Sequence, residues 1–212
     1  MLRSHRGWDP GALRCARRLA ADLGAPLLWT DLTRLLVDAN RSATNPAVFS
    51  PWTRGLAAEE RARLLAMHHA PHRTRVEHAV REVVGRRRAA LHLAIHSFTP
   101  RPHGRERYFD VGFLYDPARP GERRLAEAWK DALAQLQPEL RVRRNAPYRG
   151  RDDGLTRSLR ARFGPDRYLG LELELNQAWC RRPGPGADRA VDALRESLQV
   201  VLGLGKGPWH PE

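Results

Sequence analysis

A chain of 212 residues, 42% of them apolar, is long enough to bury a hydrophobic core of its own. Its formal net charge of +13 favours an acidic partner such as nucleic acid, but two of its 37 basic residues are lysines and the other 35 are arginines. This uniform use of arginine fits a coding bias as well as it fits a phosphate-binding surface. Aromatic residues make up only 7% of the chain and are not interleaved with the arginines, as the stacking of single-stranded nucleic acid requires. We therefore rank nucleic-acid binding second.

The chain shows neither a membrane span nor a leader peptide. No stretch approaches the roughly 18 apolar residues that a membrane-spanning helix needs. The first residues, Met1 to Trp8, lack the apolar core of a signal peptide. The two cysteines, Cys15 and Cys180, form no CxxC pair and no zinc-finger spacing. The basic neighbours of Cys15 favour a lowered thiol pKa, but isolated cysteines are usually inert. We expect a reduced, cytoplasmic protein and propose no thiol nucleophile.

The predicted elements alternate between helices and strands. In chain order they are a helix over 9–23, a strand over 25–30, helices over 57–68 and 71–86, a strand from 91 to the stop at Pro100, a strand over 108–115, a helix over 122–136, a strand over 139–144, a helix over 156–163, a strand over 168–177 and a helix over 186–202. We expect Asp9 to cap the first helix and Gly24 to end it. The alternation predicts a single three-layer α/β/α domain over residues 1–212, with a mostly parallel or mixed sheet.

The strand that begins at Leu91 ends at two polar residues, His96 and Ser97. Pro100 follows and cannot donate a ladder hydrogen bond, so strand pairing should stop there. We expect His96 at the carboxyl end of a central strand, where open α/β sheets bind their ligands. An imidazole there is a candidate metal ligand or general base, although a structural, hydrogen-bonded histidine is more common. Activation of Ser97 by His96 is disfavoured because neighbouring strand residues face opposite sides.

Two glutamates, Glu172 and Glu174, alternate with leucines in the strand over 168–177 and therefore face the same side. In an internal strand, two buried carboxylates are costly unless they are paired or bind a metal. In an edge strand, the same residues form an ordinary solvated polar face. The sequence leaves both interpretations open.

Three histidines, His68, His69 and His72, lie close together in the sequence. The spacing of His68 and His72 is that of a helical metal-binding pair, but Pro71 predicts a helix boundary between them. We therefore interpret all three as ordinary surface histidines.

Polar groups follow several of the predicted strands and turns, and the carboxyl edge of an α/β sheet would bring them together. They are Asp9, Asp38 with Asn40 and Arg41, His96 with Ser97, Asn145 with Tyr148, and Glu172 with Glu174 and Asn176. Three arginines are candidates for clamping a substrate carboxylate through bidentate hydrogen bonds: Arg34, Arg41 and Arg73. Most arginines of such an arginine-rich chain are simply solvated, so residue type alone is weak evidence that any one of the three binds substrate.

Six short segments follow one another in order between about residues 5 and 180. They are Trp8-Asp-Pro-Gly-Ala12, Thr33-Arg-Leu-Leu-Val-Asp-Ala-Asn-Arg41, His96-Ser-Phe-Thr-Pro100, Asp110-Val-Gly-Phe-Leu-Tyr-Asp116, Asn145-Ala-Pro-Tyr148 and Leu173-Glu-Leu-Asn176. Together they resemble the N-formylglutamate amidohydrolase family, a distant relative of zinc carboxypeptidases and deacylases. The resemblance implies a hydrolase-like α/β fold of the zinc exopeptidase kind. It also implies zinc-dependent hydrolysis of an N-acyl amide of an acidic amino acid, such as N-formyl-L-glutamate.

The resemblance also implies roles for individual residues. His96 matches a zinc ligand, and Asp9 is a further candidate ligand. Glu174 matches the carboxylate that takes a proton from the attacking water, and Arg41 matches a residue that holds the substrate carboxylate or the developing oxyanion. The predicted substrate-binding residues are Asn40, Arg34, Arg73, Asn145 and Tyr148.

The chain departs from the family pattern at its start. Family members usually begin with a further strand and a Cys-Glu-His-Gly-type motif, which should supply an early metal ligand, and His5 is no obvious substitute. We therefore expect a truncated start or a lost ligand, with reduced zinc affinity, so that family membership is better supported than the activity of this chain. The alternatives are a non-catalytic basic module on the same fold that binds an acidic partner or nucleic acid, and a hydrolase for another N-acyl amino acid. Steep weakening of binding by salt would distinguish the basic module.

Overall fold

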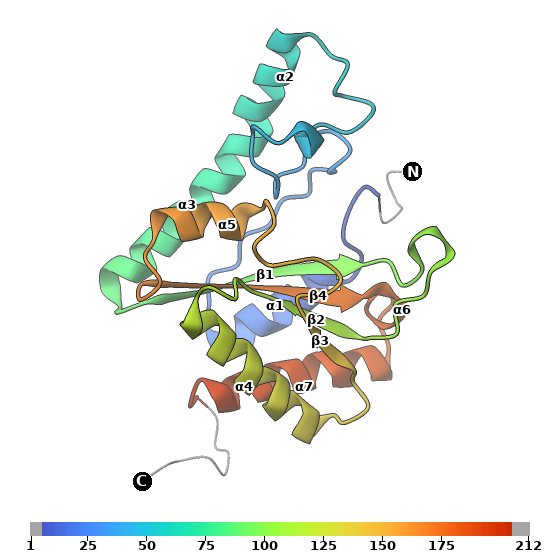
Figure 1. Ribbon diagram of the computed structural model, residues 1–212, viewed down its shortest axis with the longest axis vertical. Coiled ribbons are helices and arrows are strands. Elements are labelled where there is room, and N and C mark those ends of the chain that lie inside the picture. Colours follow the sequence, from blue (N-terminus) through green and yellow to red (C-terminus); the bar gives the residue numbers. More distant parts are fainter. Residues whose placement is uncertain (1–5, 205–212) are drawn as a thin grey trace. The chain divides into compact units, whose positions relative to one another are not determined.

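The computed structural model describes residues 6–204 and shows a mixed α/β fold. Its strands are β1 (Ala90–Phe98), β2 (Val111–Leu114), β3 (Val142–Arg144) and β4 (Tyr168–Asn176). They form an open sheet in the order β1-β4-β2-β3, flanked by helices (Figure 1). Strand β2 is antiparallel to β4 and parallel to β3, so the sheet is mixed. The predicted fold class is confirmed.

Seven α-helices lie within the described residues. They are α1 (Ala12–Leu23), α2 (Ala58–Leu64), α3 (Ala70–Arg86), α4 (Pro120–Leu136), α5 (Leu155–Arg162), α6 (Gln177–Cys180) and α7 (Pro185–Val201). Between residues 6 and 204, none of them is both long enough and apolar enough to span a membrane.

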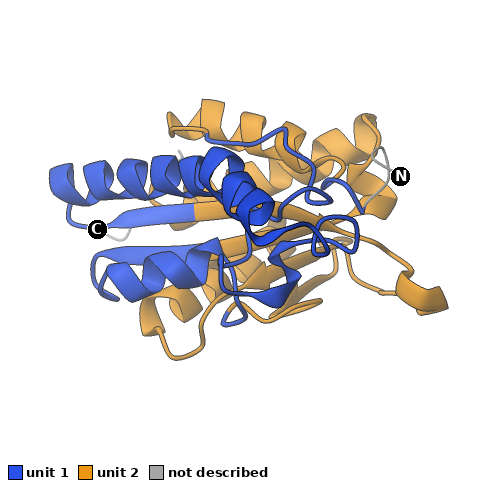
Figure 2. Cartoon of the chain, turned by 90° about the horizontal axis from the view of Figure 1, so that it is seen from above, with its two compact units in different colours: residues 1–9, 28–92, 151–170 blue, residues 10–27, 93–150, 171–212 orange. Residues whose placement is uncertain are grey.

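The chain divides into two compact units, each assembled from separate segments (Figure 2). Unit 1 comprises residues 28–92 and 151–170 with the described residues up to Asp9. Unit 2 comprises residues 10–27 and 93–150 with the described residues from Leu171 onward. Strands β1 and β4 each begin in unit 1 and continue into unit 2. A single domain over residues 1–212 stays a prediction.

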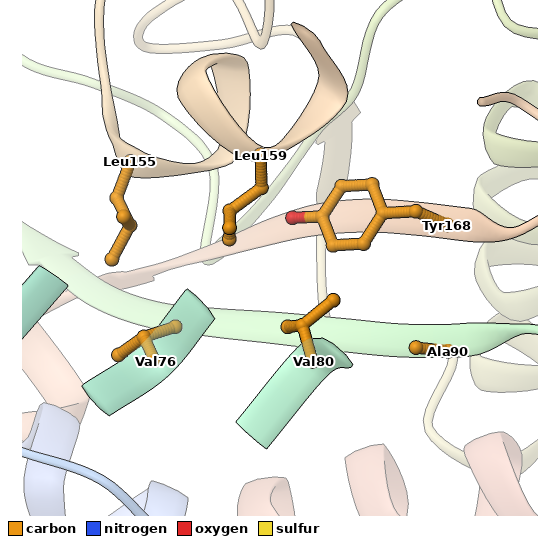
Figure 3. Packing of buried hydrophobic residues seen from close by; sticks show 6 residues of the cluster. All are labelled: Val76, Val80, Ala90, Leu155, Leu159 and Tyr168. Carbon is orange, nitrogen blue, oxygen red and sulfur yellow. The ribbon is translucent and has the colours of Figure 1, made fainter. Parts of the chain in front are cut away.

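The core of unit 1 joins helices α3 and α5 to the first residues of β1 and β4. Its buried members are Val76 and Val80 of α3, Leu155 and Leu159 of α5, Ala90 of β1 and Tyr168 of β4 (Figure 3). Each helix contributes two residues four positions apart, which lie on one face of a helix. The hydroxyl of Tyr168 is hydrogen-bonded to Nδ1 of His92 at 2.8 Å, which satisfies the polar end of a buried ring.

The core of unit 2 is centred on Trp129 of α4, which is completely buried. Its ring stacks on Phe113 of β2, with 4.8 Å between the centroids. Its Nε1 donates to the carbonyl oxygen of Leu194 at 3.1 Å and to Oγ of Ser197 at 2.9 Å, both on α7. These contacts join α4, α7 and β2, and they give the buried indole N–H of Trp129 its hydrogen-bond acceptors.

The start of the chain differs from expectation in two ways. Helix α1 begins after Gly11, whose φ is 86°. A Cβ at this position would lie 2.1 Å from the carbonyl oxygen of Cys180, so only glycine fits. Asp9 therefore does not cap the helix, whereas Gly24 ends it in a left-handed conformation as predicted. The predicted strand over 25–30 is wrong, since these residues form no regular structure and Pro26 cannot donate a ladder hydrogen bond.

The prediction of a helix boundary at Pro71 is also wrong. A π-helical segment, Leu65–His69, connects α2 directly to α3. The wider turn places Pro71 at the first turn of α3, where its missing N–H is tolerated. The same turn leaves His69 only 4% exposed, so its interpretation as a surface histidine is wrong.

Cys15 lies on the buried face of α1, and Cys180 is buried as well. Burial raises the pKa of the Cys15 thiol to about 12, because it outweighs the opposing effect of Arg14 and Arg18. The basic neighbours do act in the direction that the sequence suggests, but burial decides the pKa, which agrees with a thiol that is not a nucleophile.

Candidate functional site

Strands β1 and β4, which carry His96 and Glu174, lie next to each other in the sheet. Strand β1 is at one end of the strand order and β4 is between β1 and β2. The placement of His96 on a central strand is therefore wrong. The apolar alternation of β1 is equally suited to an edge strand covered by helices, which explains the error.

Strands β1 and β4 run in the same direction. At their beginnings, the amide of Ala90 donates to the carbonyl oxygen of Arg167 at 3.0 Å. At their ends, Nε2 of Gln177 donates to Oγ of Ser97 at 3.1 Å. In a parallel ladder the first bond pairs Ala90 with the residue after Arg167. Counting forward along both strands, we infer that His96 lies opposite Glu174.

Side chains alternate between the two sides of a strand, so Tyr168, Glu172 and Glu174 share one side of β4. The hydrogen bond between Tyr168 and His92 shows that the even-numbered positions of β1 lie on that same side. His96 is four residues beyond His92 and therefore belongs to this face. The structure thus brings the imidazole and the two carboxylates to one face of the sheet.

The structure decides between the two interpretations of the glutamates. Strand β4 is internal, and Glu172 and Glu174 are only 8% and 5% exposed. Hydrophobic residues would stabilise this layer more simply, because removing a carboxylate from water is costly. Buried carboxylates in a sheet centre are accordingly candidates for chemistry rather than for stability.

A turn that follows β3 packs against Gly112, the ladder partner of Glu174. Gly112 of β2 pairs with Glu174 across the ladder. A Cβ on Gly112 would lie 2.0 Å from the carbonyl oxygen of Ala146 and 3.3 Å from Cβ of Glu174. The Ala146–Pro147 turn, which contains a cis peptide bond, therefore lies directly on Gly112.

Asn145 shapes this turn. Its φ is 50°, and its Oδ1 accepts hydrogen bonds from the amides of Tyr115 at 3.1 Å and Gly150 at 2.9 Å. Its own amide donates to the carbonyl oxygen of Phe113 at 2.8 Å. Asn145 thus closes the segment 145–150, which also carries Tyr148, whose ring is 48% exposed. Glu174, Asn145 and Tyr148 belong to one neighbourhood in unit 2.

A second group of predicted residues is organised in unit 1 around the loop 38–45. Nη1 of Arg73 donates to the carbonyl oxygens of Ala39 at 3.2 Å, Asn40 at 2.9 Å and Arg41 at 3.2 Å. Its Nη2 donates to Oγ of Ser158. From the other side, Nε2 of buried His69 donates to the Arg41 carbonyl oxygen at 2.8 Å. Arg73 and His69 therefore hold the backbone of this loop.

Asp153 holds the second half of the loop. Its Oδ2 accepts from the amide of Ser42 at 3.0 Å and from Nδ2 of Asn45 at 2.7 Å. Burial alone would raise the pKa of Asp153, but these hydrogen bonds together with the Arg41 charge lower it below its ordinary value. Nη1 of Arg41 donates to the Asp153 carbonyl oxygen at 3.1 Å, and Oδ1 of Asn40 accepts from the first amide of α5 at 2.9 Å.

Asp9 and Arg34, two further predicted residues, form an ion pair in unit 1 at 3.2 Å. The amide of Arg34 also donates to the carbonyl oxygen of Gly7 at 3.1 Å. These contacts fix the segment that leads to Asp9 against residues 33–34.

Comparison with known proteins identifies the chain. A family model described as N-formylglutamate amidohydrolase matches residues 1–180. The chain belongs to this family. Among solved structures, the gene product Atu2144 from Agrobacterium tumefaciens is 33% identical, with a TM-score of 0.81 over 95% of this chain and 80% of that one. No curated protein matches the chain.

A second solved structure supports the fold. The N-formylglutamate amidohydrolase from Ralstonia eutropha JMP134 is 21% identical to this chain, with a TM-score of 0.59. The match covers 81% of this chain and 73% of that protein. At this identity, the likeness concerns the fold alone.

The residues between 6 and 204 do not make up a zinc site by themselves. No group of three or more histidine, cysteine, aspartate or glutamate side chains in this range is arranged to hold a metal ion. Zinc sites in hydrolases generally use three protein ligands and keep a fourth position for water or substrate. His5 lies outside the described residues, and zinc binding by His96 and Asp9 stays a prediction.

Some residues of the site were not singled out from the sequence. The sequence contained a signal for Gly112, because a glycine inside a strand often marks the close approach of another backbone segment. His69 was misjudged because the π-helical turn that buries it has no clear sequence signature. Arg107, whose guanidinium lies over the rings of Phe98 and Tyr148, is indistinguishable in sequence from the other arginines of its loop.

Proposed function

We propose that this protein hydrolyses the amide bond of an N-acyl acidic amino acid, with N-formyl-L-glutamate as the first candidate substrate. The single observation that carries the proposal is the position of Glu174, a buried carboxylate on the internal strand β4 beside the Asn145–Tyr148 turn. Membership of an amidohydrolase family supports the reaction class. We place the protein in the cytoplasm, which agrees with a chain that has only two cysteines, both of them buried.

In the proposed reaction, Glu174 accepts a proton from the attacking water as the water oxygen bonds to the acyl carbon. The carbon–nitrogen bond then breaks, and Glu174 returns the proton to the leaving amine. The products are formate and glutamate when the substrate is N-formyl-L-glutamate. The burial of Glu174 strengthens its electrostatic interaction with the water because little solvent screens it.

His96 is proposed to act on the same face of the sheet, opposite Glu174. A ring N–H of its imidazole directed at the acyl oxygen would stabilise the negative charge that develops there. Residues 6–204 contain no group of three or more possible metal ligands, and the reaction proposed for Glu174 and His96 assigns no step to a metal ion. Metal analysis of the purified full chain, with His96→Ala as the comparison, tests the prediction of zinc dependence.

Arg41 and Asn40 are proposed to bind a carboxylate of the substrate. Among the described residues, the Arg41 side chain donates only through Nη1, which leaves Nε and Nη2 for a carboxylate. Asn40 uses Oδ1 to accept from the amide of Leu155, which leaves its Nδ2 as a donor. The hydrogen bonds of Arg73 and the ion pair of Arg34 favour positioning roles for those two residues.

The test is formate release from N-formyl-L-glutamate by the purified chain. Glu174→Gln should lower kcat by about 100-fold or more, the usual contribution of a general base. Glu172→Gln is the matched control, since it removes a buried carboxylate from the same face of the same strand. If both variants fold and lose activity equally, or if Glu174→Gln stays fully active, Glu174 is not the base.

A further inference from the structure

Arg107 lies over two aromatic rings in unit 2. Its guanidinium carbon lies 5.5 Å from the ring centroid of Phe98 and 5.5 Å from that of Tyr148. Among the described residues, its side chain donates one hydrogen bond, from Nη1 to the carbonyl oxygen of Thr99 at 3.3 Å. A guanidinium has five N–H donors, so this arrangement fixes the plane of the group while using few of them.

The charge of Arg107 has no carboxylate partner among residues 6–204. Two neighbouring arginines differ in their pairing or in their exposure. Arg101 pairs with Glu106 at 3.3 Å, and Arg105 is exposed on the same loop. Arg107 is half-buried. A cation that is oriented by aromatic rings and lacks an internal counter-ion is suited to bind an external anion.

Both rings belong to elements of the candidate site. Phe98 is two residues beyond His96 on β1. Tyr148 is on the turn that lies against Gly112, the ladder partner of Glu174. Arg107 is thereby tied to the two strands and the turn that carry the proposed chemistry.

We propose that Arg107 binds the side-chain carboxylate of the substrate and gives the enzyme its preference for acidic amino acids. The inference rests on the proposed function and adds a specificity determinant to it. An N-acyl glutamate carries a side-chain carboxylate that its neutral amide analogue lacks. Tyr148 then acts mainly through its ring, by orienting Arg107, and less through its hydroxyl.

The experiment compares kcat/KM for N-formyl-L-glutamate and for its neutral isostere N-formyl-L-glutamine. Arg107→Ala should lower kcat/KM for the glutamate substrate by about 10- to 100-fold, the effect of losing a charge-assisted hydrogen-bonded pair, and change the value for the glutamine substrate by less than about 3-fold. Arg105→Ala, in the same loop, is the matched control and should keep the preference. Arg107→Lys keeps the charge but not the planar guanidinium, so its preference for the glutamate substrate should lie between that of Arg107→Ala and that of Arg105→Ala.

Two variants of Tyr148 test the positioning role. Tyr148→Phe keeps the ring and should preserve the preference for the glutamate substrate, whereas Tyr148→Ala should reduce it in the direction of Arg107→Ala. Equal losses on both substrates in Arg107→Ala, or an equal loss of preference in Arg105→Ala, would overturn the inference and leave the proposed reaction standing.

Calorimetric titration of the same two compounds separates the inference from the proposed function. If the wild-type chain hydrolyses neither compound but binds N-formyl-L-glutamate, and Arg107→Ala weakens that binding alone, the proposed reaction is wrong and the assignment of Arg107 is supported. If the wild-type chain binds neither compound, both are wrong.

Discussion

Substitution of Gly112 by alanine tests the packing on which the candidate site depends. The new Cβ would lie 2.0 Å from the Ala146 carbonyl oxygen, so that oxygen must move by about 1 Å or more to reach an ordinary contact. Asn145 resists such a movement through its bonds to Phe113, Tyr115 and Gly150. The strain falls on backbone, which yields less readily than a flexible side chain.

The expected cost follows from these contacts. Overpacking at a closed site typically destabilises by about 1–3 kcal/mol. Weakening one hydrogen bond of Asn145 adds about 1 kcal/mol. A loss of about 2–4 kcal/mol should lower the Tm of a chain of this size by roughly 5–15 °C. Movement of the turn beside Glu174 by about 1 Å should also lower kcat/KM, by up to about 100-fold.

Gly85→Ala is the matched control for this substitution. Gly85 lies inside α3, and an added Cβ there meets nothing within 4 Å. The same chemical change should therefore stabilise the protein by about 0.5–1 kcal/mol. Urea unfolding and calorimetric scans of both variants measure the difference. If Gly112→Ala unfolds at the same midpoint as the wild type and keeps its activity, the close approach of the turn to β2 is refuted.

Three further predictions concern other parts of the molecule. Arg73→Lys should lower the free energy of unfolding by about 1.5–3 kcal/mol and speed amide exchange at Ser42, because one ammonium nitrogen cannot replace both Nη1, which donates to the loop carbonyl oxygens, and Nη2, which donates to Oγ of Ser158. Cys15, with its pKa raised to about 12, should react with iodoacetamide at pH 8 far more slowly in the native protein than in urea. The pKa of Asp153 is lower in the folded state than in the unfolded state. Its contribution to stability is therefore complete at pH values above its unfolded pKa of about 3.9 and is lost as the pH falls through its folded pKa. Asp153→Asn should remove the contribution of Asp153 to the pH dependence of the free energy of unfolding. Urea unfolding between pH 6 and pH 3, a range that roughly brackets the pKa of an unfolded aspartate, measures this.

A control substitution or a specific result decides each of these predictions. Arg75→Lys, on an exposed position of α3, should leave stability unchanged, and an equal loss there would remove the role of Arg73. Rapid alkylation of Cys15 in the native state would show that the thiol is accessible and ionised. An unchanged acid dependence in Asp153→Asn would show that the carboxylate is not held by Ser42 and Asn45.

The alternation of helices and strands was readable from the sequence because it depends on local spacing. Pro100 stops β1 at Phe98, and Gly24 ends α1, since both act through their own backbone geometry. The run over 25–30 shows where local reasoning fails. It is apolar enough for a strand, but a strand forms only where another strand accepts its hydrogen bonds.

By itself, the sequence determined the α/β class, the family and the small set of residues that merit attention, because these follow from spacing, composition and motif order. Only the tertiary structure decided which strand is internal, and therefore that Glu174 is buried rather than solvated. It also decided that Arg73 holds a loop and that Arg107 lies over two rings. Burial and charge pairing depend on segments far apart in the chain, and no local pattern records which of them meet.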